Sequence, residues 1–339
     1  MNIVIIRSIF ALLISFLLTF YLVPFFCSLA RRLKFVDEPD GKIKVHKQAT
    51  PYMGGVAVYI GFLSAICIAL PFQNNMMLFF VGSTLLLFVG LIDDLVSLKP
   101  YQKFFGQILA MLCFLKAGFY LKEHFFSNFW NVFISGFWML LVVNAFNLVD
   151  VMDGLATLLA ICATTSFLAL GIYFNQDILV VLLSAFLGPL LAFLWYNKPS
   201  AQIYLGDAGS LFIGGFLATV PFLFSWGTFN INGYLAPIVI LAIPLLEVST
   251  LIFIRTYKKI PFYMGSPDHF SIYLQQNGWK KTQILQYVLV LSIILFIASF
   301  AFILNKLSFV GLLLSGAGFL AIWALAILHI NFAKNGKNG

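Results

Sequence analysis

The chain has 339 residues, of which 62% are hydrophobic and only 9% charged, and its formal net charge is +8. Soluble domains carry a charge on about a quarter of their residues, so this composition excludes a protein that buries its apolar surface in one aqueous core. Most of the chain must be solvated by lipid, and the sequence therefore predicts an all-α, polytopic integral membrane protein.

Apolar stretches long enough to cross a bilayer recur along the chain. They predict about eleven transmembrane helices, at residues 3–28, 52–70, 76–92, 103–121, 129–147, 154–174, 177–196, 209–226, 233–255, 282–304 and 308–331. The first stretch is not expected to be a cleaved signal peptide, because no small-x-small cleavage site follows it. We predict one transmembrane domain over residues 1–339.

The positions of Lys and Arg orient the predicted helices, because cytoplasmic loops are enriched in both. Arg31, Arg32 and Lys34 place the end of the first helix in the cytoplasm. Alternation then predicts these cytoplasmic segments: 29–51, 93–102, 148–153, 197–208, 256–281 and the tail after 332. The 20 Lys and Arg residues fall in or beside them, except Arg7, Lys116, Lys122 and Lys306. We predict an outside N-terminus and a cytoplasmic C-terminus, and this bias, not a nucleic acid partner, explains the net charge.

Acidic residues gather at the cytoplasmic ends of the apolar stretches, where an unpaired charge is costly. They are Asp93 and Asp94, Asp150 and Asp153, and Asp207. A single acid at a helix end is usually a cap, and Asp94 and Asp207 could each be one. Acids from several segments together favour a shared cation, and Mg²⁺ is the cation that bridges a few carboxylates to substrate phosphates.

Basic residues accompany these acids on the same predicted face. They are Lys44 and His46 in the segment KIKVHK, Lys103, and Arg255 and His269. Acids for a metal together with bases for a polyanion are what phosphoryl transfer at a membrane surface requires, although the positive-inside rule also accounts for the bases. The sequence contains neither a P-loop nor a Rossmann glycine motif, and the four Cys lie singly in apolar stretches, as packing residues do.

Six segments carry a known set of motifs in its known order: TPYMGGVAVYIG (50–61), LIDDLVSL (91–98), KFFGQ (103–107), NAFNLVDVMDGLA (144–156), NKPSAQIYLGDAGSLFIGG (197–215) and PLLEVSTLIFIR (244–255). Over nearly its full length the chain resembles the polyprenyl-phosphate N-acetylhexosamine-1-phosphate transferases of glycosyltransferase family 4. The resemblance implies an enzyme that transfers a sugar-1-phosphate, such as GlcNAc-1-phosphate, from a UDP-sugar to undecaprenyl phosphate and releases UMP.

The same resemblance implies a Mg²⁺ cofactor, with Mn²⁺ as a substitute, and a homodimer in the inner (plasma) membrane with a cytoplasmic active site. The implied pathway step is the first membrane step of cell-envelope polysaccharide synthesis. The implied catalytic acids are Asp93, Asp94 and Asp207, and the implied Mg²⁺ ligands are Asp207 and Asn147. The residues implied to contact the nucleotide or its phosphates are Asn144, Asp150, Asp153 and Lys103. His269, Asp268 and Arg255 are implied to recognise the sugar or donor, and Lys44 and His46 to lie near the site.

The chain departs from the family pattern at Ser97, Val151 and Glu247, and the segment GSPDHFSIYL has one histidine, His269, where the family often has several. The S-P-D triplet in that segment resembles the GlcNAc-type members more than the pentapeptide type. Phospho-MurNAc-pentapeptide transfer stays an alternative. So does a transporter of a lipid-linked solute, for which Glu247 is the candidate membrane-embedded charge.

Overall fold

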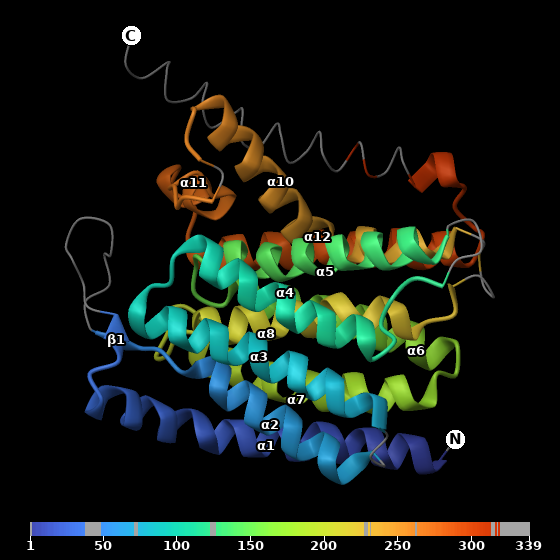
Figure 1. Cartoon of the computed structure of the whole chain (residues 1–339), viewed down its shortest axis with the longest axis horizontal. Coiled ribbons are helices and arrows are strands. Elements are labelled where there is room, and N and C mark those ends of the chain that lie inside the picture. The colour runs from blue at the N-terminus through green and yellow to red at the C-terminus, as the bar shows by residue number, and fades with distance from the viewer. Residues whose placement is uncertain are drawn as a thin grey trace. The chain divides into compact units, whose positions relative to one another are not determined.

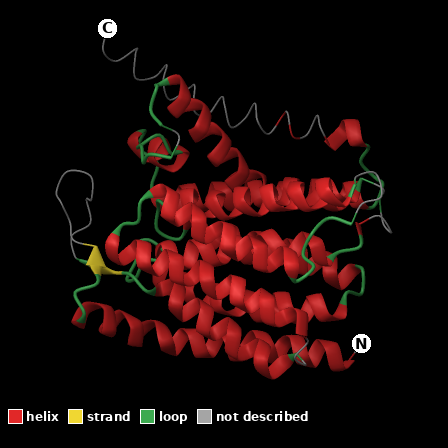
Figure 2. Cartoon of the chain, viewed as in Figure 1, coloured by secondary structure: helices red, strands yellow, loops and turns green. Residues whose placement is uncertain are grey.

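The computed structural model describes residues 2–312 apart from 38–48, 71–73, 123–126, 227–229, 231 and 262, together with 316 and 318. Helices make up most of these residues and strands only four, so the predicted all-α class is confirmed (Figure 2). Contacts between Cα atoms divide the chain into two compact units, Met1–Phe224 and Ser225–Gly339. The prediction of a single domain stays a prediction.

The first unit is a bundle of long helices, labelled in Figure 1. They are α1 (Asn2–Arg32), α2 (Gly54–Ala69), α3 (Asn74–Val96), α4 (Pro100–Lys116), α5 (Asn128–Val149), α6 (Leu155–Tyr173), α7 (Asp177–Asn197) and α8 (Gly206–Thr219), which continues as a 3₁₀ turn over Val220–Leu223. Two short strands, β1 (Val36–Asp37) and β2 (Thr50–Pro51), pair antiparallel beside the end of α1. The second unit contains a 3₁₀ turn (Gly233–Leu235), α9 (Ala236–Ile240), α10 (Ala242–Tyr257), α11 (Phe270–Gln276) and α12 (Lys281–Ile303).

Helix α8 is the centre of the first unit. It packs against α2, α3, α5 and α6, and every residue of it except Asp207 is buried. Phe212 and Phe216 of α8 pack against Phe62 of α2 and Phe186 of α7, and the rings of Phe186 and Phe216 are stacked with their centroids 3.7 Å apart. The neighbouring helices therefore enclose α8 inside the bundle.

Glycines let two neighbouring helices approach the start of α8. A Cβ on Gly90 of α3 would lie 2.3 Å from the backbone of Asp207, and one on Gly55 of α2 would lie 2.2 Å from the amide nitrogen of Gly209. Such contacts are possible only without a side chain, as in other tightly packed membrane helices. Gly90 therefore brings the acidic end of α3 against the first turn of α8.

Seven helices in the described part of the chain are long and apolar enough to cross a membrane, and the number is eight if α9 and α10 count as one bent span. The predicted span at 233–255 consists of two helices, because the chain bends by 70° between α9 and α10. Pro244 contributes to the break, because it lacks the N–H that would donate to the backbone oxygen of Ile240 in a continuous helix. The predicted span at 308–331 lies mostly outside the described residues, and the total of about eleven stays a prediction, as does the orientation.

Candidate active site

The site begins at the C-terminal end of α3, where two adjacent aspartates have different partners. Asp94 accepts hydrogen bonds from the backbone N–H groups of Asp207 (2.8 Å) and Ala208 (3.1 Å), one on each carboxylate oxygen. It therefore caps the N-terminus of α8 from a different helix, where the helix dipole favours a negative charge. Asp93 instead accepts a hydrogen bond from the backbone N–H of Leu98 (2.7 Å) and directs its second oxygen to Lys103.

The ammonium of Lys103 lies among oxygens from three other helices. Its Nζ is 2.8 Å from Asp93 Oδ2, 2.5 Å from Asp207 Oδ2 and 3.0 Å from Asn147 Oδ1. Lys103 is in the first turn of α4, whereas its partners belong to α3, α8 and α5. Asn147 also donates from Nδ2 to Asp207 Oδ1 (2.7 Å), so the four side chains form one connected network.

A second layer of polar contacts lies one helical turn away from this network. Asn144 and Gln107 exchange hydrogen bonds through their side-chain amides, at 2.8 Å and 3.2 Å. Ser210 lies one turn further along α8 than Asp207 and accepts a hydrogen bond from Asn147 (3.0 Å). The pairs Lys103–Asn147 and Gln107–Asn144 thus join α4 to α5 at consecutive turns, and the contacts with Lys103, Asp207 and Ser210 hold the amide of Asn147 in its orientation.

Gly206 supplies the backbone geometry that the start of α8 requires. Its φ is +72°, and a Cβ at this position would lie 2.6 Å from Asp94 Oδ2. Glycine reaches this left-handed conformation without steric cost. The capping contact of Asp94 therefore depends on the missing side chain of its neighbour.

Two loops complete this end of the bundle. Residues 150–154 connect α5 to α6 and residues 198–205 connect α7 to α8. Asn197 joins both loops: its Oδ1 accepts from the backbone N–H of Gly154 (3.1 Å), and its Nδ2 donates to the backbone oxygen of Ile203 (3.0 Å). Asp153 adds a contact from the backbone N–H of Ala201 at 3.4 Å.

Negative charge exceeds positive charge in this cluster. Burial, together with the carboxylates of Asp207 and Asp94, raises the pKa of Asp150 well above its usual range. In the described part of the chain, Lys103 is the ammonium that forms ion pairs with the acids of the cluster. Carboxylates that raise each other's pKa are the arrangement that an added cation stabilises most.

The donor set fits Mg²⁺. The oxygens of Asp93, Asp207 and Asn147 converge on one cation, which in this structure is the Lys103 ammonium, and carboxylate and amide oxygens are ligands that Mg²⁺ prefers. Within the described residues no group of three or more His, Cys, Asp or Glu is arranged to hold a metal by itself. Mg²⁺ normally needs only one or two protein carboxylates when substrate phosphates supply further oxygens.

The second unit contains the predicted donor-recognition residues. Arg255 belongs to α10, and His269 contacts Glu247 of the same helix. His269 Nδ1 lies 3.0 Å from Glu247 Oε1, and both side chains are buried. Arg255 donates to the hydroxyl of Ser266 (2.9 Å). These contacts fix the segment GSPDHF against α10.

Asp268 accepts hydrogen bonds from Lys258 (2.5 Å) and from the hydroxyl of Tyr273 (2.9 Å). Burial raises the pKa of Asp268, but the hydrogen bonds from Lys258, Tyr273 and Ser266 outweigh this effect and hold it below its usual range. Asp268 is therefore a stable carboxylate at neutral pH.

The structure brings most of the predicted site residues of the first unit together. Direct contacts join Asp93, Lys103, Asn147 and Asp207, and Asp94 contacts the backbone of Asp207. Lys44 and His46 lie outside the described residues. The sequence interpretation missed Gln107, Ser210 and Asn197, although each is part of one of the motif segments; their polar side chains inside apolar stretches were the available signal.

Comparison with known proteins finds one matching family model and similar enzymes of two kinds. Residues 76–225 match the family model described as glycosyl transferase family 4. The chain is similar to the probable undecaprenyl-phosphate N-acetylglucosaminyl 1-phosphate transferase of Bacillus subtilis, with 27% identity over 98% of this chain and 94% of that protein.

Pentapeptide transferases are similar as well. The phospho-N-acetylmuramoyl-pentapeptide-transferase of Clostridium acetobutylicum is 28% identical over 86% of this chain and 98% of that protein. The enzyme of the same name from Listeria monocytogenes is 31% identical over 62% of this chain and 73% of that protein.

Proposed function

This chain belongs to glycosyl transferase family 4, and from that premise we propose that it transfers a sugar-1-phosphate from a UDP-sugar to undecaprenyl phosphate and releases UMP. We propose GlcNAc-1-phosphate or a similar N-acetylhexosamine-1-phosphate as the transferred group. The proposed site is on the cytoplasmic face of the inner membrane, and the proposed process is cell-envelope polysaccharide synthesis.

The observation that carries this proposal is the cluster of Asp93, Lys103, Asn147 and Asp207, in which four helices contribute one polar side chain each. Phosphoryl transfer requires little covalent chemistry from the protein. It requires positioned charges around a phosphate that passes through a highly charged transition state. The cluster supplies both signs of charge at one point, at the end of otherwise apolar helices.

In the proposed reaction, an oxygen of the lipid phosphate attacks the β-phosphorus of the donor. A new P–O bond to the lipid forms, and the bond from the β-phosphorus to the bridging oxygen breaks, so UMP leaves with that oxygen. Lys103 would bind the phosphate oxygens on which charge accumulates, and Asp93 would orient the ammonium of Lys103. Asp94 is a positioning residue in this scheme, because both of its oxygens accept backbone hydrogen bonds of α8.

Asp207 and Asn147 would hold Mg²⁺. When bound, the ion supplies charge neutralisation on the donor diphosphate. Asp207 is suited to this role because α8 holds its backbone rigidly while its side chain stays partly exposed. Ser210, which accepts a hydrogen bond from Asn147 Nδ2, would keep the amide oxygen of Asn147 directed at the same point.

We base the proposed donor preference on the S-P-D triplet of the segment GSPDHF, which resembles the GlcNAc-type members. The similarity to the Bacillus subtilis protein over 98% of this chain supports the same preference. Within the second unit, Arg255 and Lys258 hold Ser266 and Asp268 of this triplet in place. Transfer of phospho-MurNAc-pentapeptide is the second candidate, because several pentapeptide transferases are similar to this chain over most of their length. Glu247 contacts His269 and Phe270, so its role is to hold this segment. The charge that favoured a transporter therefore has a structural explanation.

The test is UMP release by the purified full-length chain with undecaprenyl phosphate as acceptor. UDP-GlcNAc, UDP-GalNAc and UDP-MurNAc-pentapeptide would each be offered with Mg²⁺ and after its removal by a chelator. We expect Mg²⁺-dependent release with UDP-GlcNAc. Asp207→Asn should lower the rate of UMP release by at least about a hundredfold, and its melting temperature should stay near that of the parent.

Asp177→Asn is the matched control, since it alters an aspartate in the first turn of another helix, α7. Retained turnover in Asp207→Asn would contradict the metal assignment. No release from any of the three donors, by a folded protein, would contradict the proposed reaction.

A further inference from the structure

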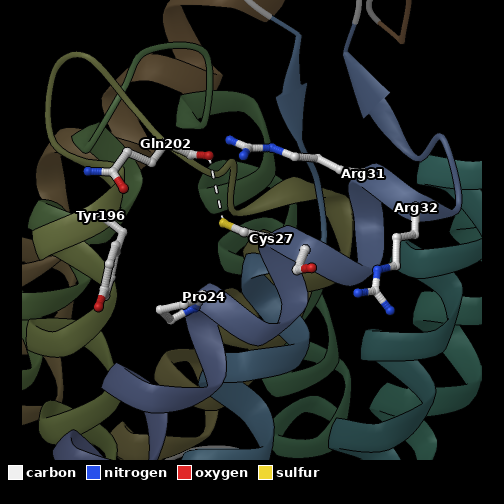
Figure 3. Close-up of a pocket in the computed structure, with 7 residues that line it drawn as sticks. Pro24, Cys27, Arg31, Arg32, Tyr196 and Gln202 are labelled. Carbon is white, nitrogen blue, oxygen red and sulfur yellow. Dashed lines mark hydrogen bonds between the residues drawn. The ribbon is translucent and has the colours of Figure 1, made fainter.

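A pocket of about 500 Å³ lies beside the C-terminal end of α1 (Figure 3). One face of α1 lines it with Pro24, Cys27, Ser28 and Arg31, at the spacing of three and four residues that defines a helix face. Tyr196 at the end of α7 and Gln202 in the loop 198–205 line the opposite side. None of these residues belongs to the acid cluster, so the pocket is a separate feature of the first unit.

Hydrogen bonds between the two sides fix the shape of the pocket. Pro24 has no N–H, so the backbone oxygen of Phe20 lacks its usual helical partner, and the hydroxyl of Tyr196 donates to it at 3.2 Å. The loop is held at Gln202. Its backbone N–H donates to the backbone oxygen of Tyr196 (2.8 Å), and its backbone oxygen accepts a hydrogen bond from the thiol of Cys27 (3.8 Å). The pocket is thus preformed by contacts among α1, α7 and the loop.

The charge at the pocket is positive. Arg31 and Arg32 both line it, and both side chains are exposed. In Figure 3 the side chain of Arg31 extends toward Gln202, while that of Arg32 leaves the helix end in another direction. Within the described residues the structure pairs neither guanidinium with a carboxylate. Two unpaired guanidinium groups at a preformed pocket indicate an anionic ligand, and a phosphate matches the guanidinium fork best.

The surroundings of the pocket indicate that the ligand is a lipid. Only 22% of the most apolar part of α1 is buried, so this helix faces the hydrocarbon. The helix face that lines the pocket continues away from Arg31 as Tyr21, Leu17 and Leu13, which are exposed to 73%, 51% and 49%. At the end of α7, the ammonium of Lys198 lies 3.9 Å from the ring centre of the exposed Trp195. Trp and Lys at a helix end are typical of the membrane–water interface.

We propose that this pocket binds an anionic membrane phospholipid, with the headgroup phosphate on Arg31, further attraction from Arg32, and an acyl chain along Tyr21, Leu17 and Leu13. Basic pockets between helices on the cytoplasmic side are suited to such headgroups. The positive-inside rule requires only that the arginines lie on that side, and it does not explain their place at a pocket that continues into an apolar face. The acceptor substrate also carries a phosphate, but its phosphate must reach Lys103 and Asp207, which do not line the pocket.

Native mass spectrometry of the full-length chain would test this proposal. The protein would be placed in phosphatidylcholine nanodiscs that contain increasing amounts of phosphatidylglycerol. After the protein is released from the nanodisc in the mass spectrometer, the phosphatidylglycerol molecules that stay bound to it would be counted. Arg31→Gln and Arg32→Gln should each weaken retention about fivefold, the effect of one basic residue near an anionic headgroup, and the double variant more than about tenfold. Both residues are exposed, so folding should be unaffected, and melting temperatures would verify this.

Arg7→Gln is the matched control, because Arg7 is an exposed arginine near the other end of the same helix. It should retain phosphatidylglycerol like the parent chain. Equal retention by the double variant and the parent would overturn the proposal. A second set of nanodiscs would contain undecaprenyl phosphate as well. The proposal would also be overturned if the double variant lost undecaprenyl phosphate there and kept phosphatidylglycerol, since the pocket would then belong to the acceptor. UMP release does not enter this test, so its outcome is independent of the proposed reaction.

Discussion

Lys103 is the residue on which the acid cluster depends most. Its ammonium is the shared partner of Asp93, Asp207 and Asn147, and none of these oxygens lies in the same helix as another. Without this charge, two carboxylates would face each other in a partly buried site, where repulsion is poorly screened. A lysine is a mobile cation on a flexible stem, so it can hold the oxygens in place and then move to a phosphate when the substrate binds.

Replacing Lys103 with methionine keeps the length of the side chain and removes its charge. We expect Lys103→Met to lower kcat/KM by about a hundredfold or more, because a donor to the developing phosphate charge is lost. Its melting temperature without metal should also fall, and Mg²⁺ should raise it by more than it raises that of the parent, since the vacated oxygens can bind the ion. Kinetics and thermal unfolding, each with and without Mg²⁺, measure both effects.

Lys99→Met is the control for this substitution. Lys99 is exposed and immediately precedes the same helix, yet it has no contact with the acids. Similar losses in both variants would mean that the general charge of this face matters, and not the contacts of Lys103.

The sequence predicted which residues this site contains better than it predicted their contacts. Asp93, Asp94 and Asp207 could be named because carboxylates at the ends of apolar stretches are costly without a purpose. Asn147 was named only through the resemblance to the family. The difference between Asp93 and Asp94 could not be seen in the sequence. It arises because α3 meets the first turn of α8 at an angle that directs only Asp94 to the exposed backbone N–H groups.

At the scale of elements, the N-terminus of α8 organises the site. Asp94 caps this helix, Gly90 and Gly55 allow its neighbours to approach, and Asp207 extends from its first turn. The helix interior is almost fully buried, so the position of Asp207 is set by the packing of the whole bundle. A site on a rigid helix end keeps its geometry better than one on a loop.

Gly206→Ala tests whether this helix start must be glycine. Alanine at φ +72° is strained, and its Cβ would also meet Asp94 Oδ2 at 2.6 Å, so Asp94 would be pushed away from the α8 backbone. We expect a lower melting temperature and a loss of kcat/KM of about tenfold or more, since a small displacement of a catalytic group is costly. Gly118→Ala separates the two effects, because Gly118 has φ +96° and, among the described residues other than its chain neighbours, no atom lies within 4 Å of its Cβ position.

The Gly118→Ala variant should lose about 1 kcal/mol of stability from backbone strain and keep its activity. If Gly206→Ala behaved in the same way, the contact between Gly206 and Asp94 would not matter for the reaction.

Elements were predictable where the apolar pattern was uninterrupted, and less so where it was broken. The stretch 233–255 is strongly apolar on average, so hydropathy predicted one span, whereas the structure has two helices that bend by 70°. Average hydropathy does not register the single missing N–H of Pro244, and the direction of the bend depends on packing that the sequence does not state.

At the scale of the whole molecule, the described structure confirms a polytopic all-α membrane protein. The direction in which the chain crosses the membrane stays a prediction from its Lys and Arg positions. In the first unit, the ends of α1 and α3 and the start of α8 lie at the same end of the bundle (Figure 1). A site assembled there from several segments requires that these segments share one side of the membrane.

Cysteine labelling tests the orientation. In a chain whose four native cysteines are replaced by alanine, Lys34→Cys and Lys306→Cys would each introduce one exposed thiol. A maleimide that cannot cross membranes should label position 306 on intact spheroplasts and position 34 only after lysis, because the predicted orientation places them on opposite sides. Labelling of both positions after lysis verifies access. Labelling of position 34 before lysis would show that the predicted orientation is inverted.

The capping contact of Asp94 has a consequence for how such a protein would decay in evolution. A copy that was released from selection for catalysis, but was still needed as a folded membrane protein, could lose Asp93 or Lys103 without exposing the start of its central helix. The loss of Asp94 would leave the backbone N–H groups of Asp207 and Ala208 without their partner. Among inactive descendants, the second aspartate of the pair should therefore outlast the first, so its presence alone is a poor sign of activity.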